Sequence, residues 1–205
     1  MLSIQTIHPN TLELLKNLAS QPELAQTRLV GGTALALQYG HRQSIDLDFF
    51  GALPEDKDEL VEMTRRVGNV LVTNRSKMIV QTVVNQVKVD FVDYSRYAWI
   101  DDPVQGNGFF LASDKDIAAM KVNAIIGRGT RKDFIDLYVL LQHYSLTEIL
   151  EFYKQKYPEF SEYRALLSMT YFEDAEMQDM PKMFIEIPWD EMKSTIIKAV
   201  KAYQE

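Results

Sequence analysis

The sequence predicts an α/β protein in which strands and helices are mixed over the first part and helices alone follow. Strand-like runs, with alternating apolar residues or rich in valine, occur at residues 44–50, 78–84 and 86–94. From Ser113 onward apolar residues recur at helical spacing. This change predicts a division into residues 1–112 and residues 113–205, which can also form one continuous domain.

Each element of the first part has its own signal. Residues 9–19 predict a helix with Asn10 as its N-cap. Leu29-Val30 is typical of the end of a strand, and residues 33–39 predict a short apolar helix that ends at Gly40. Residues 54–67 are typical of a charged helix that covers a sheet, and the runs on either side of Asn85 predict a hairpin beside the strand of residues 44–50.

The second part begins with a helix whose first turn carries Ser113 and Asp116, as in a capping box. Residues 127–130 end this helix. Residues 146–169 predict further helices, residues 172–188 irregular chain, and residues 189–203 an amphipathic helix. Core packing is the expected role of its apolar side, with contact to a partner protein or to a second copy as the alternative.

Composition restricts the functional classes. At 205 residues and 46% hydrophobic content, the chain is long enough for one domain with a substantial core. No apolar run reaches the roughly 18 residues of a membrane span, and no signal-peptide pattern opens the chain. Cysteine is absent, and the formal charge of −7 disfavours a broad nucleic-acid surface. These features indicate a cytoplasmic protein without membrane contact.

Two aspartates in the first part suggest a metal site. In an extended strand of residues 44–50, Ser44, Asp46 and Asp48 point to one face, while Ile45 points to the core. The two carboxylates then lie about 7 Å apart along the strand and can share a hard cation such as Mg²⁺. The alternative for an isolated Asp-x-Asp is a solvated strand face.

A glycine pair shortly before these aspartates suggests a phosphate site. Gly31 and Gly32 allow close approach of the backbone to a ligand, and Thr33 can begin a helix whose first amides attract phosphate. A Gly-Gly step alone is usually only a turn. Its occurrence just before Asp46 and Asp48 makes a combined phosphate and metal site the favoured interpretation.

A third carboxylate lies in the second strand of the predicted hairpin. Alternation places Lys88, Asp90 and Val92 on one face of this valine-rich strand. Asp90 can complete the metal site or act as a general base. An edge strand with one wet face is the alternative, and Asp93 is a weaker candidate.

The second part contains the clearest local excess of positive charge. On the helix after Ser113, Lys121 has apolar neighbours at helical spacing. It can neutralise phosphate in a cleft or extend from the edge of the core. Asp136 can pair with Lys121 or Arg131, contact substrate, or form an ordinary interhelical salt bridge.

These motifs together resemble the abortive-infection nucleotidyltransferase toxins of the AbiEii/AbiGii type, in the DNA polymerase β-like nucleotidyltransferase superfamily. The resemblance covers about residues 28–142. It rests on the following segments: Gly31-Gly32-Thr33-Ala34-Leu35, the run from His41 to Phe50, Val89-Asp90-Phe91, Ala119-Met120-Lys121, and the run from Arg131 to Tyr138.

The resemblance implies a mixed, twisted sheet flanked by helices and followed by a helical region. It implies a cleft in which Asp46, Asp48 and Asp90 bind Mg²⁺ or Mn²⁺. Two sets of residues follow from it. The catalytic set is Asp46, Asp48, Asp90, Lys121 and Asp136, and the nucleotide-binding set is Gly31, Gly32, Thr33, Arg42, Ser44, Lys121 and Arg131.

The implied reaction moves a nucleoside monophosphate from an NTP to an acceptor hydroxyl and releases pyrophosphate. The resemblance further implies a toxin with a cognate antitoxin and an RNA acceptor, such as a tRNA 3′ end. Two alternatives stay open. One is a nucleotide- or protein-binding module with weak catalysis, and the other is a metal-dependent phosphohydrolase, for which the chain offers few histidines. His41 can touch phosphate, although a cap or surface role is expected.

Overall fold

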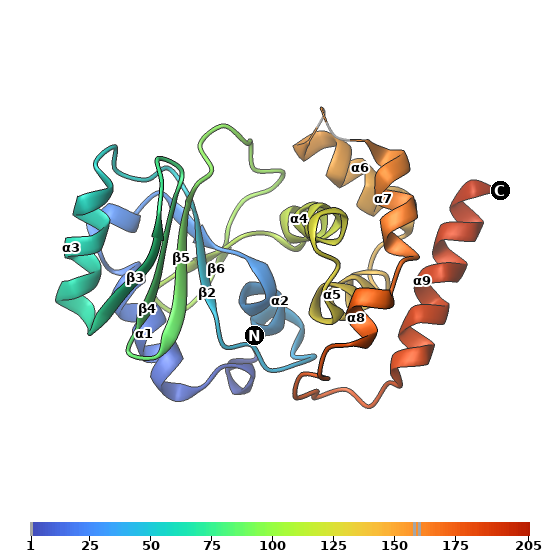
Figure 1. The fold of residues 1–205 in the computed structure, drawn as a ribbon, viewed down its shortest axis with the longest axis horizontal. Helices are drawn as coiled ribbons and strands as arrows, with labels where there is room; N and C mark the ends of the chain where they lie inside the picture. Colours follow the sequence, from blue (N-terminus) through green and yellow to red (C-terminus); the bar gives the residue numbers. More distant parts are fainter. Residues whose placement is uncertain (1, 158, 160) are drawn as a thin grey trace. The chain divides into compact units, whose positions relative to one another are not determined.

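The computed structural model describes residues 2–157, 159 and 161–205, and the chain divides into two compact units (Figure 1). The sheet unit comprises the chain up to Gly40 together with Ser44–Ala98 and Asp102–Ala112. The helical unit comprises His41–Gln43, Trp99–Asp101 and Ser113–Glu205. Two short segments from the first part of the sequence therefore belong to the helical unit.

The sheet unit contains a mixed sheet, as the sequence predicts. In the described residues it has seven strands in the order β3-β4-β5-β2-β1-β7-β6, of which the pairs β2–β5 and β1–β7 are parallel. The strands are β1 (Thr27–Leu29), β2 (Leu47–Gly51), β3 (Val70–Arg75), β4 (Ile79–Val84), β5 (Val87–Asp93), β6 (Val104–Gln105) and β7 (Phe110–Leu111). The predicted hairpin is β4–β5, and it lies beside β2.

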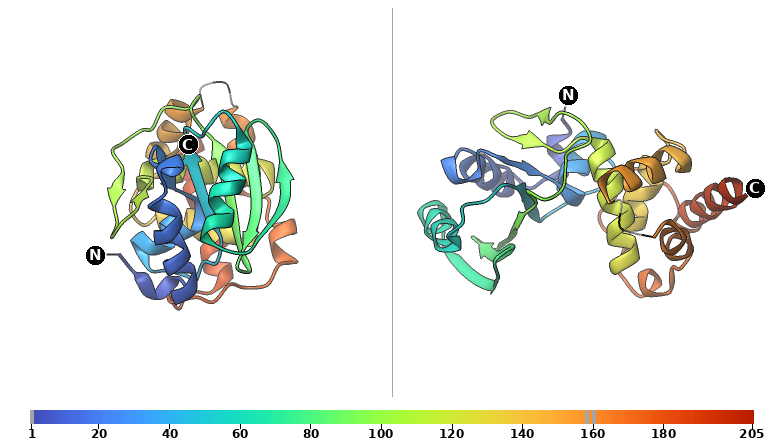
Figure 2. Two further views of the ribbon diagram at one scale, coloured as in Figure 1. Left: turned by 90° about the vertical axis from the view of Figure 1, so that its left-hand side faces the viewer. Right: turned by 90° about the horizontal axis from the view of Figure 1, so that it is seen from above.

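The helices that accompany the sheet are α1 (Pro9–Ala19), α2 (Gly31–Tyr39) and α3 (Lys57–Val67). Helix α3 packs against β3 and β4, and α1 lies beside α3 (Figure 2). Alternate residues of β2 and β4 are buried, and the rings of Phe49 and Phe91 stack with centroids 5.8 Å apart. Short 3-10 helices occupy Ile4–Thr6 and Pro22–Leu24.

Some predicted boundaries in the sheet unit are wrong. Strand β2 begins at Leu47, so residues 44–46 are not part of it, and Ile45 is 54% exposed instead of lying in the core. Helix α2 begins at Gly31 instead of Thr33. The side chain of His8, not Asn10, caps α1, because its ring nitrogen accepts the N–H of Asn10. Strand β3 is absent from the prediction, since four of its six side chains are exposed.

The helical unit is built around α4, which packs against α5, α6 and α7. Its helices are α4 (Asp114–Gly127), α5 (Arg131–Leu140), α6 (Leu146–Lys156), α7 (Glu162–Met169), α8 (Glu173–Glu176) and α9 (Trp189–Gln204). Pro158 and Phe160, within the predicted helical residues 146–169, lie outside the described residues. Helix α9 buries Met192, Ile196 and Val200 against other helices, so the predicted core packing is confirmed.

The segment His41–Gln43 is held in the helical unit by backbone pairing. Arg42 forms an isolated antiparallel bridge with Met183, and Phe184 N–H donates to the carbonyl of His41. Within the described residues, no helix has the length and apolar character needed to cross a membrane.

Candidate active site

Two of the predicted metal ligands are direct neighbours on the sheet. Asp48 on β2 is the register partner of Asp90 on β5, and these two central strands run parallel. Side chains at paired positions of adjacent strands point to the same face of the sheet. The apolar residues on either side, such as Leu47 and Val89, point to the opposite, buried face. The topology therefore brings two carboxylates side by side.

The first residue of α2 lies against Asp48. Gly31 has φ +67°, and a Cβ atom at this position would lie 2.6 Å from Asp48 Oδ2. A side chain at Gly31 would thus face both an unfavourable backbone conformation and a steric clash. The Asp48 carboxylate consequently lies beside the N-terminus of α2, where backbone amides favour negative charge.

Thr33 and Ser44 fix the segment that carries Asp46. The Thr33 hydroxyl lies 2.8 Å from the Ser44 hydroxyl and donates to the backbone carbonyl of Asp46. Ser44 N–H donates to the carbonyl of Thr6 at 2.9 Å. Thr33 and Ser44 are both buried. These contacts tie the chain before β2 to the first turn of α2, so Asp46 is positioned although it precedes the strand.

Asp90 has two donors on one oxygen. Gln81 Nε2 on β4 donates to Asp90 Oδ2 at 2.9 Å, and Lys88 Nζ lies 3.0 Å from the same atom. Asp90 Oδ1 is buried and, among the described residues, has no hydrogen-bond partner. A buried carboxylate oxygen without a donor is costly unless a ligand or cation satisfies it.

The donor set of this sheet face fits a magnesium ion. Mg²⁺ is held by one or two carboxylates, with waters and substrate phosphates completing its shell. Asp48 and Asp90 supply two such carboxylates, and Asp90 Oδ1 is an unsatisfied oxygen. The described residues contain no group of three acidic, histidine or cysteine side chains close enough to hold a metal by themselves. Asp46 is thus not assembled with Asp48 and Asp90 into a complete protein cage.

The helical unit contains the other predicted catalytic residues in a buried ionic cluster around Asp136. Arg42 donates to both carboxylate oxygens of Asp136, at 2.7 and 2.8 Å. His41 Nε2 and Lys121 Nζ lie 2.8 and 2.6 Å from the same carboxylate. Burial alone would raise the pKa of Asp136, but Arg42, Lys121 and His41 hold this pKa well below its usual range.

Lys121 is paired twice in this cluster. Its ammonium lies 3.0 Å from Asp133 Oδ1 in addition to its contact with Asp136. Burial disfavours the charged form of Lys121, but the two carboxylates outweigh this effect and raise its pKa. Asp133 also accepts from Arg128 and forms a capping box with Thr130. Of the two pairings predicted for Asp136, the one with Lys121 is present.

The structure gives the predicted nucleotide-binding arginines structural contacts. Arg42 is 2% exposed and bound to Asp136. Arg131 donates to the carbonyls of Ala175 and Glu176, and its guanidinium lies 4.9 Å from the centroid of the Trp189 ring. The cap or surface role expected for His41 is wrong, because its ring is buried against Asp136.

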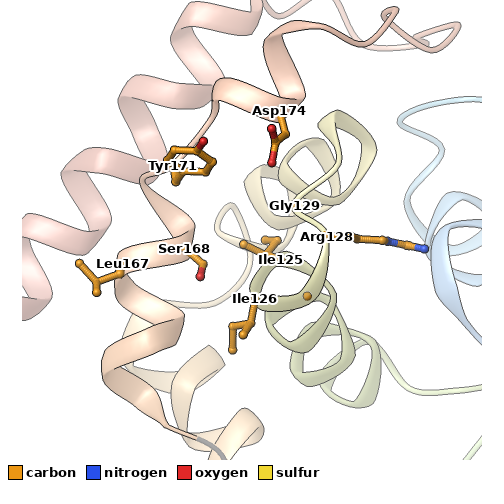
Figure 3. A pocket seen from close by; sticks show the side chains of 9 residues that line it. Ile125, Ile126, Arg128, Gly129, Leu167, Ser168, Tyr171 and Asp174 are labelled. Atoms are coloured by element: carbon orange, nitrogen blue, oxygen red, sulfur yellow. The ribbon is translucent and has the colours of Figure 1, made fainter.

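A pocket of about 470 Å³ lies in the helical unit (Figure 3). The end of α4 forms one wall, and Leu167, Ser168, Tyr171 and Asp174 form the other. Arg128 lines the pocket, but its side chain points away from the opposite wall in Figure 3. None of the predicted site residues lines this pocket.

Two polar contacts of Asp90 were not assigned a role from the sequence. Alternation along β5 already places Lys88 and Asp90 on one face, so the pairing of Lys88 was detectable. Gln81 was not detectable, because its position opposite Asp90 depends on the register of the β4–β5 hairpin.

Comparisons with known proteins identify the family of this chain. The chain matches the family described as "Nucleotidyl transferase AbiEii toxin, Type IV TA system" over residues 13–204. It is 36% identical over 184 residues to the uncharacterized protein aq_aa25 of Aquifex aeolicus, a match that covers 86% of this chain and 87% of the relative. This protein belongs to the AbiEii nucleotidyl transferase toxin family.

Solved structures share the fold at low sequence identity. JHP933 from Helicobacter pylori superposes with a TM-score of 0.58 at 18% identity, covering 98% of this chain and 93% of that one. MenT4, a nucleotidyltransferase toxin from Mycobacterium tuberculosis, gives a TM-score of 0.55 at 13% identity, covering 94% of this chain and 80% of that one. The predicted α/β fold is thereby confirmed.

Proposed function

We propose that this protein transfers a nucleoside monophosphate from an NTP to an acceptor hydroxyl and releases pyrophosphate. The observation that carries the proposal is the pairing of Asp48 with Asp90 on parallel strands, beside the N-terminus of α2. Carboxylates for a hard cation and helix amides for phosphate then lie on one sheet face. Membership of the AbiEii family supports the reaction class.

In this reaction the oxygen of the acceptor hydroxyl forms a bond to the α-phosphorus. The bond from that phosphorus to the oxygen bridging the α and β phosphates breaks, and pyrophosphate leaves with the electron pair. We assign the hydroxyl proton to the Asp90 carboxylate. Such transfers depend mainly on positioning and charge neutralisation, so the absence of cysteine from the chain is no obstacle.

We assign Asp46, Asp48 and Asp90 as ligands of Mg²⁺ or Mn²⁺. The cation would neutralise developing charge and help the acceptor hydroxyl to ionise. Gly31 and Gly32 would present backbone amides to the triphosphate, and Thr33 and Ser44 would hold the segment of Asp46 in place.

For the helical unit, we propose that Asp136 orders Lys121. An ammonium carries three N–H donors, and Asp133 and Asp136 each take one. The third would donate to a phosphate oxygen. Arg42 and Arg131, predicted as nucleotide ligands, would act through the contacts that hold Asp136 and the C-terminal segment in place.

The partners belong to the same proposal. We propose an RNA acceptor, such as a tRNA 3′ end, and a cognate antitoxin, because the family is described as a toxin of a type IV toxin–antitoxin system. MenT4, a structural relative, is itself described as a nucleotidyltransferase toxin. The cytoplasm supplies both NTP and RNA, and we place the reaction there.

The test is transfer of label from each of four α-³²P NTPs to total RNA, with and without Mg²⁺. We expect Mg²⁺-dependent labelling that falls at least about 100-fold in Asp48→Asn, since the loss of a metal-binding carboxylate removes several kcal/mol of charge stabilisation. Asp179→Asn, at an exposed position of the helical unit, is the matched control. Labelling that persists in Asp48→Asn would contradict the assignment of this site.

A further inference from the structure

Lys88 brings a positive charge onto the acidic sheet face. It lies two residues before Asp90 on β5, so the two side chains share a face of the strand. Its ammonium is 3.0 Å from Asp90 Oδ2, and its side chain is 49% exposed. The same oxygen accepts from Gln81, whereas the buried Oδ1 has no hydrogen-bond partner among the described residues. The two donors therefore use one side of the carboxylate.

The ammonium also lies close to the other carboxylate of the paired strands. Asp90, which it contacts at 3.0 Å, is the register partner of Asp48 on β2. Lys88 therefore shares the sheet face with two of the proposed metal ligands. A divalent cation held by the same carboxylates would experience repulsion from Lys88 at short range.

We infer that Lys88 is the resident counter-ion of Asp90, which a divalent cation must displace from Oδ2 to bind. The inference rests on the proposed metal-binding function of Asp46, Asp48 and Asp90. Lys88 lowers the affinity of the nucleotide-free protein for the metal, because ion and ammonium compete for one carboxylate. Together with Gln81, it also holds the Asp90 carboxylate through Oδ2 when no metal is present.

The experiment is a titration of the nucleotide-free protein with Mn²⁺, followed by electron paramagnetic resonance of the free ion. We expect Lys88→Met to bind Mn²⁺ about tenfold more tightly than the unmodified protein, since a nearby positive charge is removed. Lys88→Arg retains the charge and should stay within about twofold of the unmodified protein. Lys16→Met, at an exposed position on α1, controls for the change in net charge.

Two outcomes separate this inference from the proposed function. If Mn²⁺ binds to the unmodified protein and binding is lost in Asp48→Asn, but Lys88→Met binds no more tightly, the role of Lys88 is wrong and the metal site stands. If neither the unmodified protein nor Lys88→Met binds Mn²⁺ at millimolar concentrations, both the inference and the assignment of the metal ligands are overturned.

Discussion

The two acidic clusters of this protein use the same side chain in different surroundings. In the helical unit Asp136 is completely buried and contacts Arg42, Lys121 and His41. In the sheet unit Asp48 is only partly buried, and Asp90 pairs with a half-exposed lysine. A buried carboxylate whose charge is fully paired does not readily exchange its partners for a ligand. A carboxylate with a displaceable partner can accept one. On this comparison we expect substitutions in the Asp136 cluster to affect stability most, and substitutions on the sheet face to affect the proposed cation site most.

The largest effect is expected from Asp136→Asn. This change leaves Arg42 and Lys121 buried without the carboxylate that neutralises them, and breaking a buried pair in this way costs about 3–5 kcal/mol. The free energy of unfolding from urea denaturation measures it. Asp179→Asn serves as the control at an exposed position. A decrease of less than about 1 kcal/mol in the free energy of unfolding would contradict a stabilising role for this cluster.

The second-largest effect is expected from acid, which should weaken the ion pairs of the same cluster. The pKa values of Asp133 and Asp136 are lowered in the folded protein by their cationic partners, although burial opposes this. Their contribution is therefore complete above the unfolded value near 3.8 and is lost as the pH falls below it. Each such carboxylate adds a slope of about 1.4 kcal/mol per pH unit in that range. Below pH 4, stability should fall less steeply in Asp136→Asn than in the unmodified protein; equal slopes would contradict this.

A moderate effect is expected from Thr33→Val. The substitution keeps the shape of the side chain but removes the hydroxyl that contacts Ser44 and the carbonyl of Asp46. A lost buried hydrogen bond that leaves a partner unsatisfied costs about 1–3 kcal/mol. Mn²⁺ affinity should weaken as well, because the segment of Asp46 loses its support. Destabilisation without any change in metal affinity would limit Thr33 to the fold.

The smallest effect on stability is expected from Asp90→Asn. The amide oxygen can still accept from Gln81, and a half-exposed ion pair such as that with Lys88 contributes only about 0–1 kcal/mol. Unfolding free energy should change by no more than about 1 kcal/mol while transfer activity is lost. If the free energy of unfolding fell as much as in Asp136→Asn, the proposed difference between the two clusters would be contradicted.

Local sequence patterns account for much of the fold. Apolar periodicity, turn-forming residues and capping account for the limits of α1, the hairpin around Asn85 and the N-cap of α4 at Ser113. The pattern fails at residues 44–46, where alternation suggested a strand. The hydroxyl of Thr33 donates to this segment and the carbonyl of Thr6 accepts from it, and a single-sequence pattern does not contain these tertiary hydrogen bonds.

The sequence by itself determined the residue types of the candidate site: Asp46, Asp48 and Asp90 for a cation, and the Gly31-Gly32 step before a helix. Tertiary structure decided how they are used. Register between parallel strands paired Asp48 with Asp90, and long-range contacts of Asp136 with Arg42 and Lys121 buried the residues predicted to bind nucleotide. Periodicity specifies which face a side chain takes, but the partner it meets there depends on chain segments far away in sequence.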